Sequence, residues 1–298
     1  FALFVVPVFA LLVALEVLWF RRARRDYPWR DSLASVGVWL GRFLTGLAGG
    51  VVIGAAFVAV WELTPLRIPL DNVWSWALLF VGLEFFYYWF HRCSHEIRWM
   101  WATHNVHHSA ERLHLVASYR LGWTSLISGS WLFYLPLVAM GFEPAAVLLM
   151  LSVNLAYQFW LHTDAIGKLP RWFEYVFNTP SHHRVHHAVN AKYLDANYAG
   201  VLIIWDRLFG TFVAEDEEKP RYGIVSQLGT FNPFRIAFHE WAGIWRDVTH
   251  AKSMREVIGF VFGPPGWSPD GSRKTSASIK AAWREQAARQ QAAAAPAE

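Results

Sequence analysis

Long apolar stretches separated by short polar segments dominate the chain. Five such stretches occupy residues 1–20, 36–60, 73–90, 121–140 and 145–161. A helix rises 1.5 Å per residue, so about 20 apolar residues cross the hydrocarbon core of a bilayer, which is about 30 Å thick. The pattern predicts an all-α fold, a polytopic membrane bundle with four to five spans.

The basic residues predict how this bundle is oriented. Arg21, Arg22, Arg24 and Arg25 follow the first stretch directly. A cleaved signal peptide carries its positive charge before the apolar stretch, so a membrane helix with a cytoplasmic C-terminal end is favoured. With a tight hairpin at residues 141–144, counting the spans places every histidine-rich segment on the cytoplasmic side.

The segments after the fifth stretch are interpreted as cytoplasmic. Residues 231–248 have the pattern of an amphipathic helix, which either rests on the bilayer or packs its apolar face on the domain. Gly263-Pro264-Pro265-Gly266 breaks the chain, and a frayed helix or disordered tail is expected through Gln290, Gln291 and residues 292–295. These divisions predict N-terminal membrane helices over residues 1–72, a catalytic domain over 73–262 and a C-terminal tail over 263–298.

Composition narrows the class of protein. Only 17% of the 298 residues are charged, whereas 54% are hydrophobic and 18 are tryptophans, as expected for helices whose ends lie at a bilayer interface. The single cysteine, Cys93, excludes an intrachain disulfide framework and makes a thiolate metal site implausible. The net charge of +4 comes without a long basic run, which argues against a nucleic-acid partner. The many Ala, Arg and Trp residues suggest a bacterial source, and hence a bacterial inner membrane.

Ten of the 13 histidines gather in four short segments. They are His91 and His95; His104, His107 and His108; His162; and His182, His183, His186 and His187. Spacings of three and four put side chains on one helical face. Neutral imidazole binds iron, zinc, copper and nickel, and ten rings exceed what one ion accepts, so two metal ions are inferred. His114, His239 and His250 are expected to be non-ligands. A structural zinc site, a metal transporter and ordinary buried histidines are the weaker alternatives.

The order of these histidine motifs resembles the fatty acid hydroxylase superfamily, also called the sterol desaturase family, and especially its alkylglycerol monooxygenase branch. The matching stretches are 88–92 (YWFHR), 158–163 (QFWLHT), 178–187 (NTPSHHRVHH), 197–200 (NYAG) and 205–212 (WDRLFGTF). The resemblance implies a non-haem di-iron centre that activates O2 and hydroxylates a lipid. Desaturation on the same centre is the alternative, and a zinc hydrolase or a metal transporter is a more distant one.

The resemblance also implies roles for particular residues. The metal ligands would be His91, His95, His104, His107, His108, His162, His183, His186 and His187, with His182 as a tenth ligand or as a hydrogen-bond partner of one. Some family members have histidine where this chain has Gln158, which leaves one coordination position open to question. Glu96 matches an acidic residue of the alkylglycerol branch and is assigned as a partner of a ligand or as a proton carrier. Zinc could replace iron in isolated protein, and the electron donor would be a reductase, a cytochrome or a tetrahydropterin.

Other polar residues near the motifs are candidates for supporting roles. Glu84 lies on the helical face of His91 and His95, and a carboxylate within a membrane span is functional by default, so it is expected to bind a ligand histidine. Asn154, Gln158 and His162 recur every four residues and are expected to face the site. Asp195 and Asn197 are predicted to support the last histidine cluster, whereas Asp206 is predicted to be structural. Substrate chains would enter from the bilayer beside Phe85, Phe86, Tyr87 and Tyr88.

Overall fold

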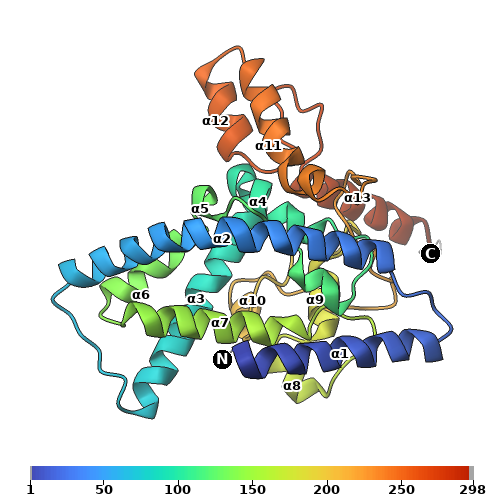
Figure 1. The fold of residues 1–298 in the computed structure, drawn as a ribbon. Coiled ribbons are helices and arrows are strands. Elements are labelled where there is room, and N and C mark those ends of the chain that lie inside the picture. The colour runs from blue at the N-terminus through green and yellow to red at the C-terminus, as the bar shows by residue number, and fades with distance from the viewer. Residues whose placement is uncertain (1, 295–298) are drawn as a thin grey trace.

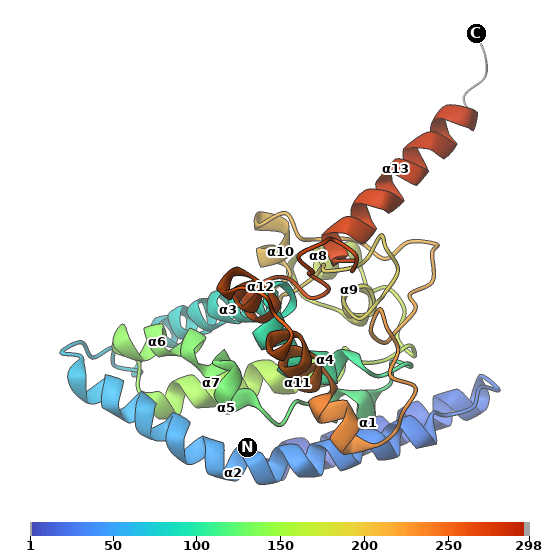
Figure 2. The same ribbon diagram turned by 90° about the horizontal axis from the view of Figure 1, so that it is seen from above.

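The computed structural model describes residues 2–294, and this part of the chain is helical and contains no β-strand (Figures 1 and 2). Two isolated bridges pair Phe177 with Leu202 and Ala188 with Tyr222. The α-helices (α) and 3-10 helices (η) run in the order α1 (Ala2–Arg22), α2 (Trp29–Leu63), α3 (Val73–Glu96), α4 (Arg98–His108), η1 (Leu115–Tyr119), α5 (Ser125–Ser128), η2 (Ser130–Tyr134), α6 (Leu135–Ala139), α7 (Pro144–Phe159), α8 (Arg171–Val176), α9 (Pro180–His186), α10 (Ile204–Leu208), α11 (Pro233–Thr249), α12 (Met254–Phe262) and α13 (Ser276–Ala294). The prediction of an all-α fold is confirmed.

Two helices within residues 2–294, α2 and α3, are long and apolar enough to cross a membrane. In Figure 1, α1, α2 and α7 run in similar directions and α3 crosses them. Much of α2 is both apolar and exposed; Leu33 is 70% exposed and Val51 is 74% exposed. Apolar side chains directed outward along a whole helix are what contact with lipid requires. The larger number of spans predicted from the sequence stays a prediction.

The fourth apolar stretch is not one helix, so the prediction of a continuous span over residues 121–140 is wrong. It is divided into α5, η2 and α6. Gly129, which ends α5, has the left-handed φ of 77°, and Pro136 at the start of α6 has no N–H to continue a helix. The fifth stretch does form a helix, but α7 has 16 residues and spans only about 24 Å.

The centre of the bundle is packed around α3. Leu79, Leu83 and Tyr87 on α3 are buried against a cluster that includes Leu137 of α6 and Val147 of α7. Lipid tails are as apolar as leucine, so close packing, rather than removal of apolar surface from water, holds such helices together. This packing fixes the direction in which the C-terminal end of α3 presents its histidines.

A sharp turn separates α3 from α4. Ile97 is extended, with φ −114° and ψ 117°, so α3 ends at Glu96 and α4 begins as a separate helix at Arg98. The first residue of α4, Arg98, donates its backbone N–H to the Gly263 carbonyl at 3.0 Å. The Arg98 side chain donates to Glu240 and Asp247 of α11, both at 2.6 Å. The segment after α12 and the helix α11 therefore set the direction of α4.

The amphipathic segment and the predicted tail both form helices. On α11, Ile236 and Ile244 are buried against the rest of the protein, whereas Trp245 is 72% exposed. The end of the chain is not disordered as far as Ala294, because α13 is continuous and projects from the molecule (Figure 2). Its Lys280 donates to the Leu194 carbonyl at 2.6 Å. Residues 295–298 of the predicted tail lie outside the described residues.

Candidate metal centre

Four separate parts of the fold carry the histidines to one place. The last two turns of α3 supply His91 and His95, and α4 supplies His104, His107 and His108. His162 follows α7, and the last histidine cluster lies on α9 and at its C-terminal cap. The extended residue Ile97 turns α4 back so that its histidines face those of α3.

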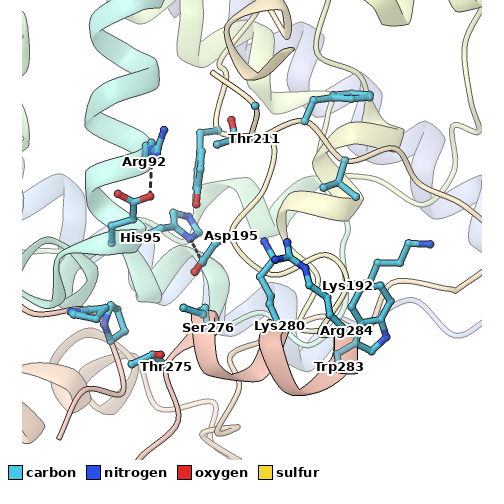
Figure 3. A pocket seen from close by; sticks show the side chains of 18 residues that line it. Arg92, His95, Lys192, Asp195, Thr211, Thr275, Ser276, Lys280, Trp283 and Arg284 are labelled. Atoms are coloured by element: carbon cyan, nitrogen blue, oxygen red, sulfur yellow. Dashed lines mark hydrogen bonds and ion pairs between the residues drawn. The ribbon is translucent and has the colours of Figure 1, made fainter. Parts of the chain in front are cut away.

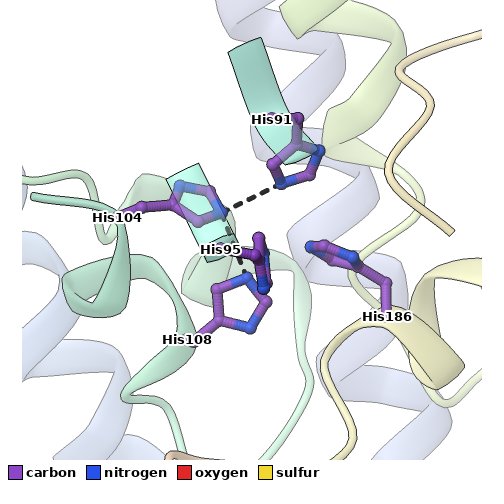
Figure 4. A group of neighbouring side chains, drawn as sticks. All are labelled: His91, His95, His104, His108 and His186. Carbon is purple, nitrogen blue, oxygen red and sulfur yellow. Dashed lines mark hydrogen bonds between the residues drawn. The ribbon is translucent and has the colours of Figure 1, made fainter. Parts of the chain in front are cut away.

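Five of these rings form one group. His91, His95, His104, His108 and His186 each offer a nitrogen, and these five nitrogens all lie within 4.8 Å of one another. Figure 4 shows the rings converging from α3, α4 and α9. The Nε2 atoms of His91 and His104 are 2.9 Å apart, and those of His104 and His108 are 3.2 Å apart. We call this set the five-histidine group.

A second set, the four-histidine group, lies beside the first. It consists of His107, His162, His183 and His187, all buried, with ligand nitrogens again within 4.8 Å of one another. The Nε2 atom of His162 is 3.1 Å from that of His107 and 2.9 Å from that of His183. The two groups adjoin, because the His108 and His187 rings are stacked with their centroids 4.4 Å apart.

Backbone carbonyls fix the protonation of several rings. The Nδ1 atoms of His91, His162 and His186 lie 2.7 to 3.0 Å from the carbonyl oxygens of Tyr198, Gln158 and Ala196, respectively. A carbonyl only accepts hydrogen bonds, so Nδ1 carries the proton in each neutral ring and Nε2 keeps its lone pair. Burial lowers the pKa of His162 to about 4 and the pKa of His186 well below its usual range, so both rings are neutral near pH 7.

The donor set fits two transition-metal ions. The Nε2 atoms of His95 and His186 are buried without a hydrogen-bond partner among residues 2–294, although both face the five-histidine group. Two imidazole nitrogens bound at right angles to one ion, each at about 2.1 Å, lie about 3 Å apart. The contacts of 2.9 to 3.2 Å within both groups match that separation. Ligand histidines in metalloproteins also commonly donate their other N–H to a carbonyl or carboxylate.

The sequence predicted that Asp195 supports the last histidine cluster. In the structure it lies instead against the first cluster (Figure 3). Its Oδ1 atom is 3.3 Å from Nδ1 of His95. Burial opposes ionisation of Asp195, but His95, Ser276 and Lys280 outweigh it and hold the pKa of this carboxyl below its usual value. Its neighbour Asn197 donates to the His182 and Val213 carbonyls, at 3.0 and 2.8 Å. Both Asp195 and Asn197 have left-handed φ, which Asp and Asn tolerate better than most residues.

Glu84 does not bind a histidine within the described residues, contrary to expectation. Its carboxylate accepts hydrogen bonds from the Asn154 side chain and from the backbone N–H groups of Val201 and Leu202. Asn154 in turn accepts from Gln158 at 2.6 Å. Glu84 therefore joins α3 and α7 to the loop at residues 198–202, whose Tyr198 carbonyl accepts from His91.

Glu96 and His182 lie outside both histidine groups. Glu96 pairs with Arg92 at 2.8 Å, its side chain is 49% exposed, and its hydrogen bonds in the described structure include none to a histidine. His182 is buried but belongs to neither group; its ring packs against Phe212, with centroids 5.3 Å apart. His114, His239 and His250 lie outside both groups as well.

Some supporting groups carried no signal in the sequence. The carbonyls of Tyr198 and Ala196 belong to the backbone, which every residue has, so no residue type reveals them. Asp206 holds the same loop by accepting from the N–H groups of Tyr198 and Ala199, at 2.7 and 2.8 Å. The stretch WDRLFG indicated that Asp206 is structural, but it did not indicate which ligand Asp206 supports.

Fold and site together define a class: a helical protein with a long apolar helix that ends in two adjoining imidazole sites suited to metal ions. Residues 76–211 match the model of the fatty acid hydroxylase family, so this part of the chain is a fatty acid hydroxylase domain. It is 38% identical over 270 residues to an alkylglycerol monooxygenase of Homo sapiens, an alignment that covers 90% of this chain and 60% of that protein.

More distant relatives also carry names of lipid-modifying enzymes. An ornithine lipid hydroxylase of Rhizobium tropici is 32% identical over 178 residues, which covers 55% of this chain and 54% of that protein. A cholesterol 25-hydroxylase-like protein of Danio rerio is 28% identical over 151 residues, which covers 48% and 57%. No solved structure matches the chain. The chain spans only about 60% of the length of the alkylglycerol monooxygenases of Homo sapiens and Danio rerio.

Proposed function

We propose that this protein is a membrane-bound di-iron monooxygenase that uses O2 to hydroxylate a lipid. The observation that carries the proposal is the pair of adjoining histidine groups, in which the buried Nε2 atoms of His95 and His186 lack any other partner in the described structure. The fatty acid hydroxylase domain and the names of the relatives support lipid hydroxylation over desaturation.

The histidine groups would hold the two ions. The five-histidine group would hold one ion and the four-histidine group the other, and iron held by imidazoles supplies the redox chemistry that activates O2. Gln158 does not complete the smaller group, because its amide oxygen accepts from Tyr87 and its amide nitrogen donates to Asn154. The four-histidine group would therefore keep a coordination position that the protein does not fill.

The lipid would reach this centre from the side of the apolar helices. The ring of Tyr87 is buried on α3 with its centroid 5.5 Å from that of His91, so it borders the five-histidine group. Of the other aromatic residues suggested for the entrance, Phe85 packs on Trp205 and Phe209, and the Tyr88 hydroxyl lies 2.9 Å from that of Thr211. The chain would pass between α3 and its neighbours without displacing these contacts.

The membrane orientation is part of the proposal. α2 and α3 would span a bacterial inner membrane, with the histidine groups on the cytoplasmic side. The four arginines at residues 21–25 support this orientation through the positive-inside rule. The alkylglycerol, ornithine lipid and cholesterol named for the relatives suggest a lipid with a polar head as the substrate.

Lipid mass spectrometry of cells with and without the protein tests this function. The expected product is a lipid heavier by one oxygen atom, and growth under ¹⁸O2 should label that atom. His186→Ala and His162→Ala should abolish the product and lower the bound iron, whereas His250→Ala on the exposed end of α11 should not. A product lighter by two hydrogens would assign desaturation. Purified protein that binds only zinc or carries metal across vesicles, with no O2-dependent product, would overturn the proposal.

A further inference from the structure

The hairpin of α11 and α12 exposes a row of large apolar side chains on each helix. On α11 the row includes Phe234, Phe238 and Trp245, of which Phe234 and Trp245 are 66% and 72% exposed. On α12 it consists of the exposed side chains Met254, Ile258 and Phe262. Residues four apart lie in one row along a helix. We call these two rows the outer rows. Exposed apolar surface of this kind marks a site of contact with a protein or a membrane.

The start of α11 lies against the part of α2 where that helix leaves the protein. With 35 residues α2 is about 52 Å long, whereas the hydrocarbon core of a bilayer is about 30 Å thick. The first turns of α2 are buried in the protein, from Asp31 to Val38, and Val38 shares a cluster with Ile236 of α11. The next residue, Trp39, is exposed, as is common for tryptophan at a membrane interface. For an α2 that crosses the bilayer, α11 therefore begins at the level of the lipid headgroups.

The outer row of α11 faces the membrane part of the chain. The ring of Phe234 packs on that of Trp123, with centroids 5.1 Å apart, and Nε1 of Trp241 donates to the Thr124 hydroxyl at 2.9 Å. Both partners lie at the start of the fourth apolar stretch. Trp245, one turn further along α11, is exposed, and the hairpin projects from the bundle across the direction of α2 (Figure 1). A hairpin that crosses a spanning helix at this level lies along the membrane surface.

Three arginines beside the outer rows give this surface a positive charge. Arg235, Arg246 and Arg255 each follow a residue of the outer rows directly, and all three are exposed. Their guanidinium groups make no hydrogen bond or ion pair within residues 2–294, whereas the carboxylates of Glu240 and Asp247 point inward and pair with an arginine of α4. The charges that α11 directs outward are therefore positive, which complements the phosphate groups of anionic lipids.

We propose that the α11–α12 hairpin is a membrane-surface anchor that binds anionic phospholipid. The outer rows enter the layer between the headgroups and the acyl chains, and the three arginines pair with lipid phosphates. Because Arg98 joins α11 to the start of α4, the anchor also fixes the height of the histidine groups above the bilayer. The inference rests on the membrane span of α2 and is independent of the reaction at the histidine groups.

A spin label on the outer row of α12 measures where the hairpin lies. Ile258→Cys is labelled with a nitroxide in the Cys93→Ala background, with Val51→Cys on α2 as the lipid reference and Arg289→Cys on α13 as the water reference. The protein is placed in nanodiscs of phosphatidylcholine or of an equal mixture of phosphatidylcholine and phosphatidylglycerol. Collisions with O2, which enters lipid, and with a water-soluble nickel chelate report the depth of each label. The ratio of O2 to nickel collisions at residue 258 should be several times that at residue 289, and phosphatidylglycerol should raise it further.

Charge variants test the role of the arginines. Each arginine near an anionic membrane strengthens binding about fivefold. Arg235→Gln, Arg246→Gln and Arg255→Gln together should therefore remove the increase that phosphatidylglycerol causes at residue 258 and leave the Val51 label unchanged. Arg284→Gln with Arg289→Gln, on the exposed side of α13, is the control and should retain the increase.

Three results would overturn the anchor. In the first, the label at residue 258 meets nickel as readily as the label at residue 289 in both lipids, which places the hairpin in water. In the second, that label is shielded from both reagents and the purified protein is dimeric or larger, which assigns the outer rows to a protein partner. In the third, the ratio at residue 258 is the same with and without phosphatidylglycerol, which removes the anionic lipid from the proposal. None of these results bears on whether the protein hydroxylates a lipid, which the product measurement decides.

Discussion

At the scale of single residues, four of the grouped imidazoles are held through Nδ1, so their Nε2 atoms can face the metal centre. Backbone carbonyls hold His91, His162 and His186, and a carboxylate holds His95. Spacing in the sequence predicted which histidines share a helical face. It could not decide whether His182 or its neighbour His183 joins the metal centre. That choice depends on the rotation of the short helix α9, which turns His183 inward and His182 toward Phe212.

Replacing Asp195 with Asn tests whether this carboxylate orients His95. Asn tolerates the left-handed φ of 48°, so the loop should keep its shape, but the negative charge is lost. We expect the affinity of the five-histidine group for iron to fall roughly 10- to 100-fold, as for other partners of metal-binding histidines. Competition with a coloured chelator measures this. Asp270→Asn, on an exposed turn, is the control, and equal affinity in both variants would show that Asp195 is dispensable.

At the scale of elements, the loop at residues 198–202 depends on a close approach to α7. A Cβ atom at Gly200 would lie 2.3 Å from Nδ2 of Asn154 and 3.1 Å from the Tyr87 ring. Gly200→Ala should therefore displace the loop whose Tyr198 carbonyl holds His91, at a cost of roughly 1 to 3 kcal/mol. The apparent melting temperature in detergent and the bound iron should both fall.

Gly167→Ala provides the matched control for that substitution. A Cβ atom at Gly167 meets nothing within 4 Å. The melting temperature and the iron content of the Gly167→Ala variant should therefore equal those of the parent protein. If Gly200→Ala behaves like Gly167→Ala, the loop accommodates a methyl group, and its contact with Asn154 does not position the metal centre.

The attachment of α11 to the start of α4 should depend on pH through Asp247. The pKa of Asp247 is lowered to about 2, mainly by hydrogen bonds from Arg273. Burial acts to raise this pKa, and the hydrogen bond and charge of Arg98 lower it further. Because the folded pKa is below the ordinary value of 3.8, the stabilisation of about 2 kcal/mol is complete above about pH 4 and disappears as the pH falls toward 2.

Thermal unfolding of metal-free protein between pH 5 and pH 2 measures this contribution. Asp247→Asn should melt lower than the parent protein at pH 5, and the difference should vanish near pH 2. Asp71→Asn, on the exposed turn before α3, should retain the parent profile. A constant difference between Asp247→Asn and the parent protein across this range would contradict the role of the carboxylate charge.

At the scale of the whole molecule, the orientation in the membrane can be measured with single cysteines. The chain has one cysteine, Cys93, so Cys93→Ala gives a background without thiols. In intact cells a membrane-impermeant maleimide should label Asp71→Cys, between α2 and α3, but should label Arg289→Cys on α13 only after lysis. Both positions should react in detergent. The opposite pattern would place the histidine groups outside the cytoplasm.

The return of α13 to the end of α3 is a further feature of the whole molecule that the sequence did not reveal. Its Ala-rich and Gln-rich composition indicated a frayed or disordered end, because it lacks an apolar face of its own. Only the folded arrangement brings Lys280 to the Leu194 carbonyl and Trp283 to a cavity of about 740 Å³ whose wall includes His95 (Figure 3).

The sequence by itself determined the helical class, the apolar helices and the histidines that gather at the centre. These properties follow from local periodicity and from the chemistry of imidazole, both of which are visible in one dimension. The tertiary structure decided the sorting into groups of five and four, the partners of Glu84 and Asp195, the division of the fourth stretch and the cavity under α13. Those features depend on helix rotation, on backbone carbonyls and on contacts between residues far apart in the chain, and spacing encodes none of these.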